Sequence, residues 1–174
     1  MISDPALVAA IVGASVALVV GIIAAAASSY WSSRRAELEE RARVRTVYAE
    51  AFAAVAAYKE LPYAIHRRRP SELEAERIRL SEDMREIQEK LSYYHAWIRG
   101  ESATVSSKYD ELVAELRKVA GRACRDAWLG PLRVRDADMN FSPPIDLSAI
   151  TPFENAFIEA VGAELKIRRR VKND

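Results

Sequence analysis

One stretch decides the fold of this chain: Val105-Ser-Ser-Lys-Tyr109-Asp-Glu-Leu112-Val-Ala-Glu-Leu116-Arg-Lys-Val119-Ala-Gly-Arg-Ala123. Its apolar residues recur at alternating steps of four and three, which is the period of one face of an amphipathic helix. Val113, Ala120 and Ala127 widen that face, so the helix has more apolar surface than it can leave in water. The pattern predicts a helix over residues 103–129 that packs against other helices.

Similar apolar stripes lie on both sides of this segment. Residues 33–61 carry one before Pro62, which we expect to end or kink that helix. Residues 71–99 carry another, and Ser71-Glu-Leu-Glu74 has the form of a capping box, which begins a helix by satisfying free amide groups. A second such box, Thr151-Pro-Phe-Glu154, predicts a shorter helix over residues 151–169.

Long helices of similar length joined by short connections favour antiparallel neighbours. We therefore expect an all-α fold in which residues 33–170 form an antiparallel bundle of three long helices with the shorter fourth alongside. The connection 130–150 is longer than most loops, and loops of that length are functional or disordered. Its apolar residues predict that it is pinned across the bundle, and together with the fourth helix it is the first place to look for a partner surface.

The N-terminal part of the chain has a different composition. Residues 6–27 contain no charge, and at 1.5 Å per residue they are long enough to cross the roughly 30 Å hydrocarbon layer of a bilayer. Asp4-Pro5 is a favourable helix start. A cleaved signal peptide is the alternative, but it would need a basic start and a shorter apolar segment. We expect a short extracytoplasmic tail over residues 1–5 and one transmembrane helix over 6–28.

The basic residues predict how this helix is oriented. Residues 29–45 form an arginine-rich juxtamembrane helix, and no basic residue precedes the span, so the positive-inside rule places the N-terminus outside and the bundle in the cytoplasm. In an up-down bundle the basic C-terminal tail also returns to the bilayer, unless it is simply a solvated end. The residues expected at the membrane interface are Tyr30, Trp31, Arg34, Arg35, Arg168, Arg169, Arg170 and Lys172.

Small residues recur at every fourth position of the predicted span. Such a row lets two helix backbones approach closely in lipid, which predicts a homo-oligomer held by the span. The alternative is that the row only reflects a segment rich in alanine and glycine. The residues expected at this contact are Ala9, Gly13, Ala17, Gly21 and Ala25.

No pattern predicts catalysis, a cofactor or a metal. The only cysteine, Cys124, excludes an intramolecular disulfide and is expected to be buried. The histidines, His66 and His95, lie at opposite ends of the second helix and so do not share a metal. Asp136-Ala-Asp138-Met-Asn140 begins like a calcium-binding loop, but the sixth and twelfth positions of that loop depart from the pattern.

The densest basic run outside the tail is His66-Arg-Arg-Arg69. Acidic residues surround it, and it lacks the wide basic field that nucleic-acid binding requires. We expect no nucleic-acid partner and interpret the run as a solvated turn between helices. The remaining alternative is a site for an acidic partner or a phosphate.

An apolar span, an arginine-rich junction and the segment Val47-Tyr-Ala-Glu-Ala-Phe52 resemble uncharacterised single-span membrane proteins of actinobacteria and their phages, over roughly residues 6–60. The resemblance implies no activity. The leading hypothesis is a non-enzymatic adaptor, tethered to membrane lipid, that binds an unidentified protein or self-associates. The alternatives are a membrane-active effector of the phage-defence, exclusion or toxin type, and an enzyme whose site the sequence does not reveal.

Overall fold

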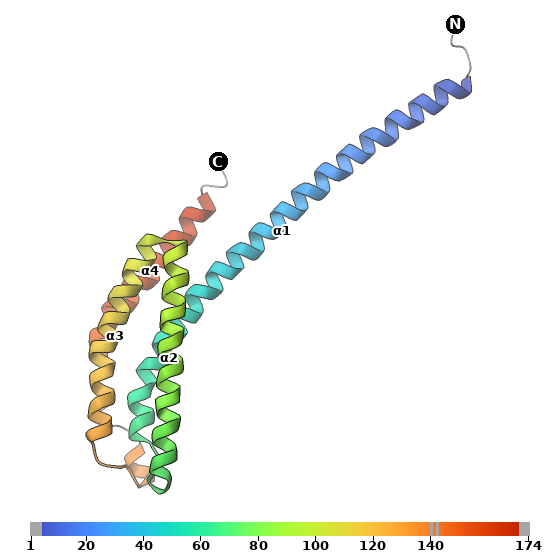
Figure 1. The fold of residues 1–174 in the computed structure, drawn as a ribbon. Coiled ribbons are helices and arrows are strands. Elements are labelled where there is room, and N and C mark those ends of the chain that lie inside the picture. Colours follow the sequence, from blue (N-terminus) through green and yellow to red (C-terminus); the bar gives the residue numbers. More distant parts are fainter. Residues whose placement is uncertain (1–4, 140, 142, 171–174) are drawn as a thin grey trace. The chain divides into compact units, whose positions relative to one another are not determined.

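The computed structural model describes the backbone of residues 5–139, 141 and 143–170, and the side chains of these residues except 5–20, 136 and 168–170. Within this part of the chain the fold is entirely helical, with no strand. The long helices are α1 (Pro5–His66), α2 (Leu73–Glu101), α3 (Ala103–Leu129) and α4 (Thr151–Arg170), as Figure 1 shows. Three short 3-10 helices, η1 (Pro70–Glu72), η2 (Asp136–Met139) and η3 (Ser148–Ile150), lie in the connections.

The chain divides into two compact units, Met1–Val44 and Arg45–Asp174. Most of the predicted span, residues 6–20, has side chains that lie outside the described residues. Across the residues that are described, no helix combines the length and the apolar character needed to cross a bilayer. The membrane helix over residues 6–28 therefore stays a prediction.

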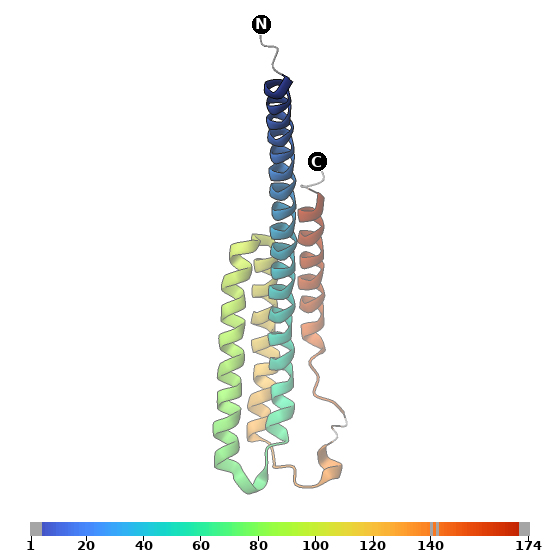
Figure 2. The same cartoon turned by 90° about the vertical axis from the view of Figure 1, so that its right-hand side faces the viewer.

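The C-terminal unit is the expected helical bundle. Figure 2 shows α2, α3 and α4 lying lengthwise beside one another, with α2 and α3 joined by a tight turn. The last part of α1 contacts each of them. Glu50 accepts a hydrogen bond from the Tyr94 hydroxyl of α2 at 2.7 Å, the Tyr58 hydroxyl lies beside Gly121 of α3, and Lys59 pairs with Glu154 of α4 at 2.8 Å.

The predicted apolar stripe of α3 is the centre of the core. Val105, Tyr109, Leu112 and Leu116 are fully buried, as the spacing predicts. The stripes of the other helices are buried less completely. Their buried apolar residues include Tyr48, Ala51, Val55 and Tyr58 of α1, Leu80, Leu91 and Ile98 of α2, and Phe157 of α4.

Of the two expectations for Pro62, that it ends the first helix is wrong. The helix continues through Pro62 to His66, although proline lacks the amide hydrogen that the helix ladder uses. Pro62 is itself buried, and the flanking Leu61 and Ile65 are buried in the core. Packing of this last turn therefore outweighs the loss of one backbone hydrogen bond.

Neither predicted capping box forms. Ser71 lies within η1, and α2 begins after Glu72, which makes no side-chain cap hydrogen bond. Thr151 has helical dihedral angles because η3 runs directly into α4, so it is not an N-cap. Among the described residues, Ser102 caps a helix start, because its hydroxyl accepts a hydrogen bond from the Val105 amide of α3 at 3.4 Å.

Candidate functional site

The site with the most elaborate polar structure lies where α1 ends, α2 begins and α3 ends. Arg68, only 7% exposed, follows α1 and reaches the carboxyl end of α3. Its guanidinium donates hydrogen bonds to the carbonyl oxygens of Ile65 at 2.8 Å, Ala127 at 2.9 Å and Gly130 at 3.2 Å. The last carbonyls of a helix lack partners within the helix, so Arg68 closes the end of α3 as a cap supplied by another segment.

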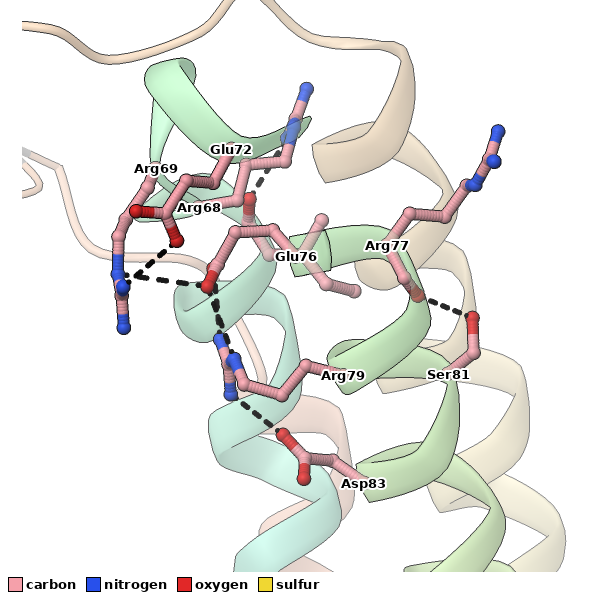
Figure 3. A network of polar contacts seen from close by, with 9 residues as sticks. Arg68, Arg69, Glu72, Glu76, Arg77, Arg79, Ser81 and Asp83 are labelled. Atoms are coloured by element: carbon pink, nitrogen blue, oxygen red, sulfur yellow. Dashed lines mark hydrogen bonds and ion pairs between the residues drawn. The ribbon is translucent and has the colours of Figure 1, made fainter. Parts of the chain in front are cut away.

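Glu76 of α2 is the buried acid beside this turn. It is 4% exposed, and its carboxylate accepts two hydrogen bonds from Arg79, at 3.0 and 3.2 Å, and lies 3.7 Å from Arg69 (Figure 3). The hydrogen bonds from Arg79 are the main cause that lowers the pKa of Glu76, and the charge of Arg69 adds to the effect. Arg69 also pairs with Glu72, and Arg79 with Asp83.

The first arginine of the run, Arg67, contacts the long connection. Arg67 lies over the rings of Tyr63 and Phe141, with its guanidinium carbon 5.8 and 5.4 Å from their centroids. The guanidinium carbon of Arg133 also lies over the Phe141 ring, 4.4 Å from its centroid. The Tyr63 hydroxyl also donates to the Ile145 carbonyl at 3.4 Å. The prediction that the connection is pinned to the bundle is thus confirmed at Phe141 and Ile145.

These contacts correct the interpretation of His66-Arg-Arg-Arg69 as a solvated turn at Arg68, whereas Arg67 and Arg69 are exposed as that interpretation expects. Arg68 is buried, and Arg67 and Arg69 are both engaged by residues of the chain itself. This could not be recognised from the sequence, because the carbonyls of Ala127 and Gly130 lie 59 and 62 residues away from Arg68. Arg68, whose hydrogen bonds are already made within the protein, is a poor ligand for a phosphate and instead holds the end of the bundle together.

A pocket of about 300 Å³ opens beside this turn, between the end of α1, α3 and the connection. Arg122 and Asp126 of α3 line it, and their side chains make no hydrogen bond or ion pair with any described residue. His66 also lines it, and its Nδ1 atom is buried without a partner among the described residues. Burial lowers the pKa of His66, and the charges of Arg133 and Arg68 lower it further, so the imidazole is neutral at pH 7.

Large apolar side chains stand exposed at the same end of the bundle. Leu129 is 77% exposed, Val134 is 71% exposed, and Trp128, which lies under the Arg68 guanidinium, is 37% exposed. We call these three residues the terminal apolar patch. Arg68 reaches the carbonyls of Trp128 and Gly130, on either side of Leu129, and Arg133, which precedes Val134, lies over the Phe141 ring. Such an arrangement suits binding to another protein.

The acidic run Asp136-Ala-Asp138 does not build a metal site in the described residues. The Asp138 carboxylate accepts two hydrogen bonds from Arg135 at 3.0 Å, which lower its pKa. The side chain of Asp136 and all of Asn140 lie outside the described residues. Nowhere in the described chain do three histidine, cysteine or acidic groups gather as a metal would require.

The residues predicted for the membrane are described only in part. Ala9, Gly13, Ala17 and the tail residues Arg168, Arg169, Arg170 and Lys172 lie outside the described side chains. Gly21 and Ala25 are exposed, and a Cβ atom added at Gly21 would meet nothing within 4 Å. Tyr30, Trp31, Arg34 and Arg35 are also exposed.

Cys124, as predicted, is buried, and burial raises the pKa of its thiol to about 11. It is therefore protonated and unreactive at neutral pH. No protein-family model matches the chain, and no match is found among the curated proteins or the solved structures. The function is accordingly argued from the chain's own residues.

Proposed function

We propose that the chain is a non-enzymatic adaptor, tethered by its N-terminal helix to the cell membrane, whose bundle binds another protein on the cytoplasmic side. The observation that carries this proposal is that large apolar side chains are exposed in both units of the chain. They include Ile22, Ile23, Tyr30 and Trp31 in the N-terminal unit and Trp128, Leu129 and Val134 in the C-terminal unit.

Exposed apolar residues in the N-terminal unit support the tether. A helix that is apolar on all sides is stable inside a protein or in lipid, and the described residues 21–31 are all exposed. The uncharged sequence of residues 6–28 is long enough to cross the hydrocarbon layer. Tyr30 accepts a hydrogen bond from Arg34 at 3.2 Å, a pairing that suits the polar boundary of a bilayer.

The bundle topology supports a second membrane contact. In the C-terminal unit α4 starts beside the last turns of α1, where Lys59 pairs with Glu154, and its later part lies beside the α2–α3 turn, where Ser102 donates a hydrogen bond to Glu164. It therefore runs antiparallel to the last part of α1. Connectivity then favours a position near the cytoplasmic leaflet for Arg168, Arg169, Arg170 and Lys172. Each basic residue near an anionic leaflet contributes about 1 kcal/mol of attraction.

The tether is tested by fractionating bacterial cells that express the full chain. The protein is expected in the membrane fraction, resistant to alkaline carbonate, and protease added outside spheroplasts should leave the bundle intact. Replacing Val16→Arg together with Val19→Arg should release it, because two charges at mid-span oppose insertion. Leu38→Arg, at an exposed position beyond the span, is the control and should remain in the membrane. A freely soluble wild-type protein would refute the tether.

The partner surface is tested by chemical crosslinking in the same cells. We expect Leu129→Ser with Val134→Ser to abolish specific crosslinked products, because it removes the two most exposed apolar groups of the terminal apolar patch. Ile158→Ser is the control, because Ile158 of α4 is an exposed apolar residue outside the patch (51% exposed). This variant should keep the crosslinked products. If the crosslinked products disappear in both variants, or persist in both, the terminal apolar patch is not the partner surface.

Self-association through the span is a separate part of the proposal. A bulky side chain in the row of small residues would keep two helices apart, whereas the same change beside the row would not. Gly21→Leu should therefore abolish dimers that are crosslinked in membranes, and Ile22→Leu should preserve them. Dimers that survive Gly21→Leu would show that another surface holds the copies together.

A further inference from the structure

The terminal apolar patch has an unpaired cation beside it on α3. Arg125 lies one helical turn before Trp128 and Leu129, and residues at this spacing are neighbours on a helix surface. Arg125 is exposed, and its side chain makes no hydrogen bond or ion pair with any described residue. Its charge is therefore available to a group that approaches the patch.

Two further arginines converge on the Phe141 ring, next to Val134 of the patch. The guanidinium carbons of Arg133, the residue before Val134, and of Arg67 lie 4.4 and 5.4 Å from the centroid of that ring. Arg133 donates a hydrogen bond to a backbone carbonyl at 2.9 Å and Arg67 to another at 3.4 Å, but neither pairs with a carboxylate among the described side chains. Two positive charges are thus held at one ring without a neutralising acid.

The balance of charge around the patch is positive. Residues 122–135 contain four arginines and one acidic residue. Arg135 is the one of these arginines that pairs with a carboxylate among the described side chains. Burial lowers the pKa of His66 at this end of the bundle, and the charges of Arg133 and Arg68 lower it further. The positive field therefore reaches neighbouring groups of the protein itself.

We propose that the terminal apolar patch binds an acidic segment of another protein, whose apolar side chains cover the patch and whose carboxylates pair with Arg125 and Arg133. This inference rests on the proposed function, because it names the chemistry of the partner at the same surface. Guanidinium groups bind carboxylates through strong, charge-assisted hydrogen bonds. Complementary charges around an apolar centre give an interface its specificity and its fast association.

The place of the patch in the bundle favours a protein over an anionic lipid surface. Trp128 of the patch lies beside Arg68, just after the end of α1. Residues 45–66 of α1 belong to the bundle, and at 1.5 Å per residue they place this end about 30 Å from residue 45. A bundle tethered through the residues that precede it therefore holds the patch away from the bilayer.

The inference is tested with fluorescent peptides that are identical except that a pair of leucines is flanked by glutamate, glutamine or lysine. The full chain is placed in phosphatidylcholine nanodiscs, binding is measured by fluorescence anisotropy, and nanodiscs without the chain give the background. The glutamate peptide should bind saturably, the glutamine peptide about tenfold more weakly, and the lysine peptide more weakly still. Added salt should weaken the binding of the glutamate peptide and leave that of the glutamine peptide unchanged.

Two variants and one matched control locate the binding. Arg125→Glu should weaken binding of the glutamate peptide about tenfold or more and should strengthen binding of the lysine peptide, because the reversed charge attracts it. Arg133→Gln should weaken binding of the glutamate peptide several-fold. Arg117→Glu reverses another exposed arginine of α3 that lacks an ion pair with any described residue but lies more than two turns from the patch. It should leave the binding of all three peptides unchanged.

The inference is overturned if the glutamate peptide does not bind, if the glutamine peptide binds equally well, or if Arg125→Glu binds the peptides like the wild type. An equal loss in Arg117→Glu would overturn it too, because the effect would then reflect the overall charge of α3. If phosphatidylglycerol vesicles displace the glutamate peptide from the wild type but not from Arg125→Glu, the surface meets anionic lipid instead of a protein.

Failure of the proposed function gives a different result. If the patch is not a partner surface, Leu129→Ser with Val134→Ser should bind every peptide like the wild type. If the glutamate and glutamine peptides bind the wild type equally and both are lost in this double variant, the patch is a partner surface and only the acidic character of the partner is wrong.

Discussion

Arg68 and Tyr109 are both buried polar residues of the C-terminal unit, yet their surroundings differ completely. Arg68 reaches four backbone carbonyl oxygens, three of them at 2.8 to 3.2 Å and that of Trp128 at 3.5 Å. The Tyr109 hydroxyl is buried and reaches none. The first arrangement closes a helix end, and the second leaves a donor unused.

The difference separates buried polar groups that stabilise the fold from those that do not. A buried group whose hydrogen bonds are all made stabilises the fold, and its removal leaves the partner groups unsatisfied. A buried group without a partner destabilises the folded protein. The effect of removing each group should therefore follow the number of hydrogen bonds it makes, which four experiments can test.

The largest effect is expected for Arg68→Met. Methionine fills similar space but leaves the carbonyls of Ile65, Ala127 and Gly130 without their donor, so the free energy of unfolding should fall by about 3 kcal/mol. Thermal unfolding followed by circular dichroism measures the change. Arg67→Met is the matched control, because Arg67 is the neighbouring residue in the sequence and is exposed. It should lower the free energy of unfolding by less than about 1 kcal/mol. Equal effects would show that Arg68 is not a special cap.

A smaller effect is expected at the ion pair between α1 and α4. Lys59→Met leaves the Glu154 carboxylate, which is only 8% exposed, without its cation at 2.8 Å. The free energy of unfolding should fall by about 2 kcal/mol. The double variant Lys59→Met with Glu154→Leu removes both charges and should recover part of that loss. If the double variant is less stable than Lys59→Met alone, the loss of stability in Lys59→Met does not come from the unpaired Glu154 carboxylate.

Much of the bundle could be predicted from the sequence because apolar periodicity is a local signal. Residues of α3 at steps of four and three are buried as expected, and the predicted bounds of α3 agree with the structure. The capping boxes failed because capping depends on backbone geometry at one residue, and a 3-10 helix precedes both α2 and α4. Packing around Pro62 likewise overrode a local rule.

The polar sites could not be predicted because their residues are distant in sequence. Arg68 binds the Ala127 carbonyl, and no local pattern pairs these positions. The contact between His95 and Tyr109 did have a usable signal. His95 and Tyr109 lie equally far from Ser102 at the turn, and residues equally far from the turn of an antiparallel helix pair face each other. Pairing positions across that turn would have brought His95, Tyr109 and Asp110 together.

A pH-dependent effect is expected for Glu76. Because Arg79 and Arg69 lower the pKa of this buried acid below 4.5 in the folded state, its contribution to stability is present above about pH 4.5. That contribution is lost as the pH falls through the lowered pKa. Glu76→Gln should be less stable than the wild type at pH 7, and the two should converge at low pH. A difference that is constant with pH would exclude this linkage.

The smallest effect, and the one of opposite sign, is expected for Tyr109→Phe. In the unfolded chain water satisfies the hydroxyl, whereas in the folded chain it has no partner, so its removal should leave stability unchanged or raise it by about 1 kcal/mol. Tyr94→Phe is the matched control, because the Tyr94 hydroxyl donates to Glu50 at 2.7 Å and its loss should lower stability. Thermal unfolding of both variants in the same buffer gives the comparison. If Tyr109→Phe is destabilised as much as Tyr94→Phe, a bound water already satisfies the Tyr109 hydroxyl, and the contrast with Arg68 disappears.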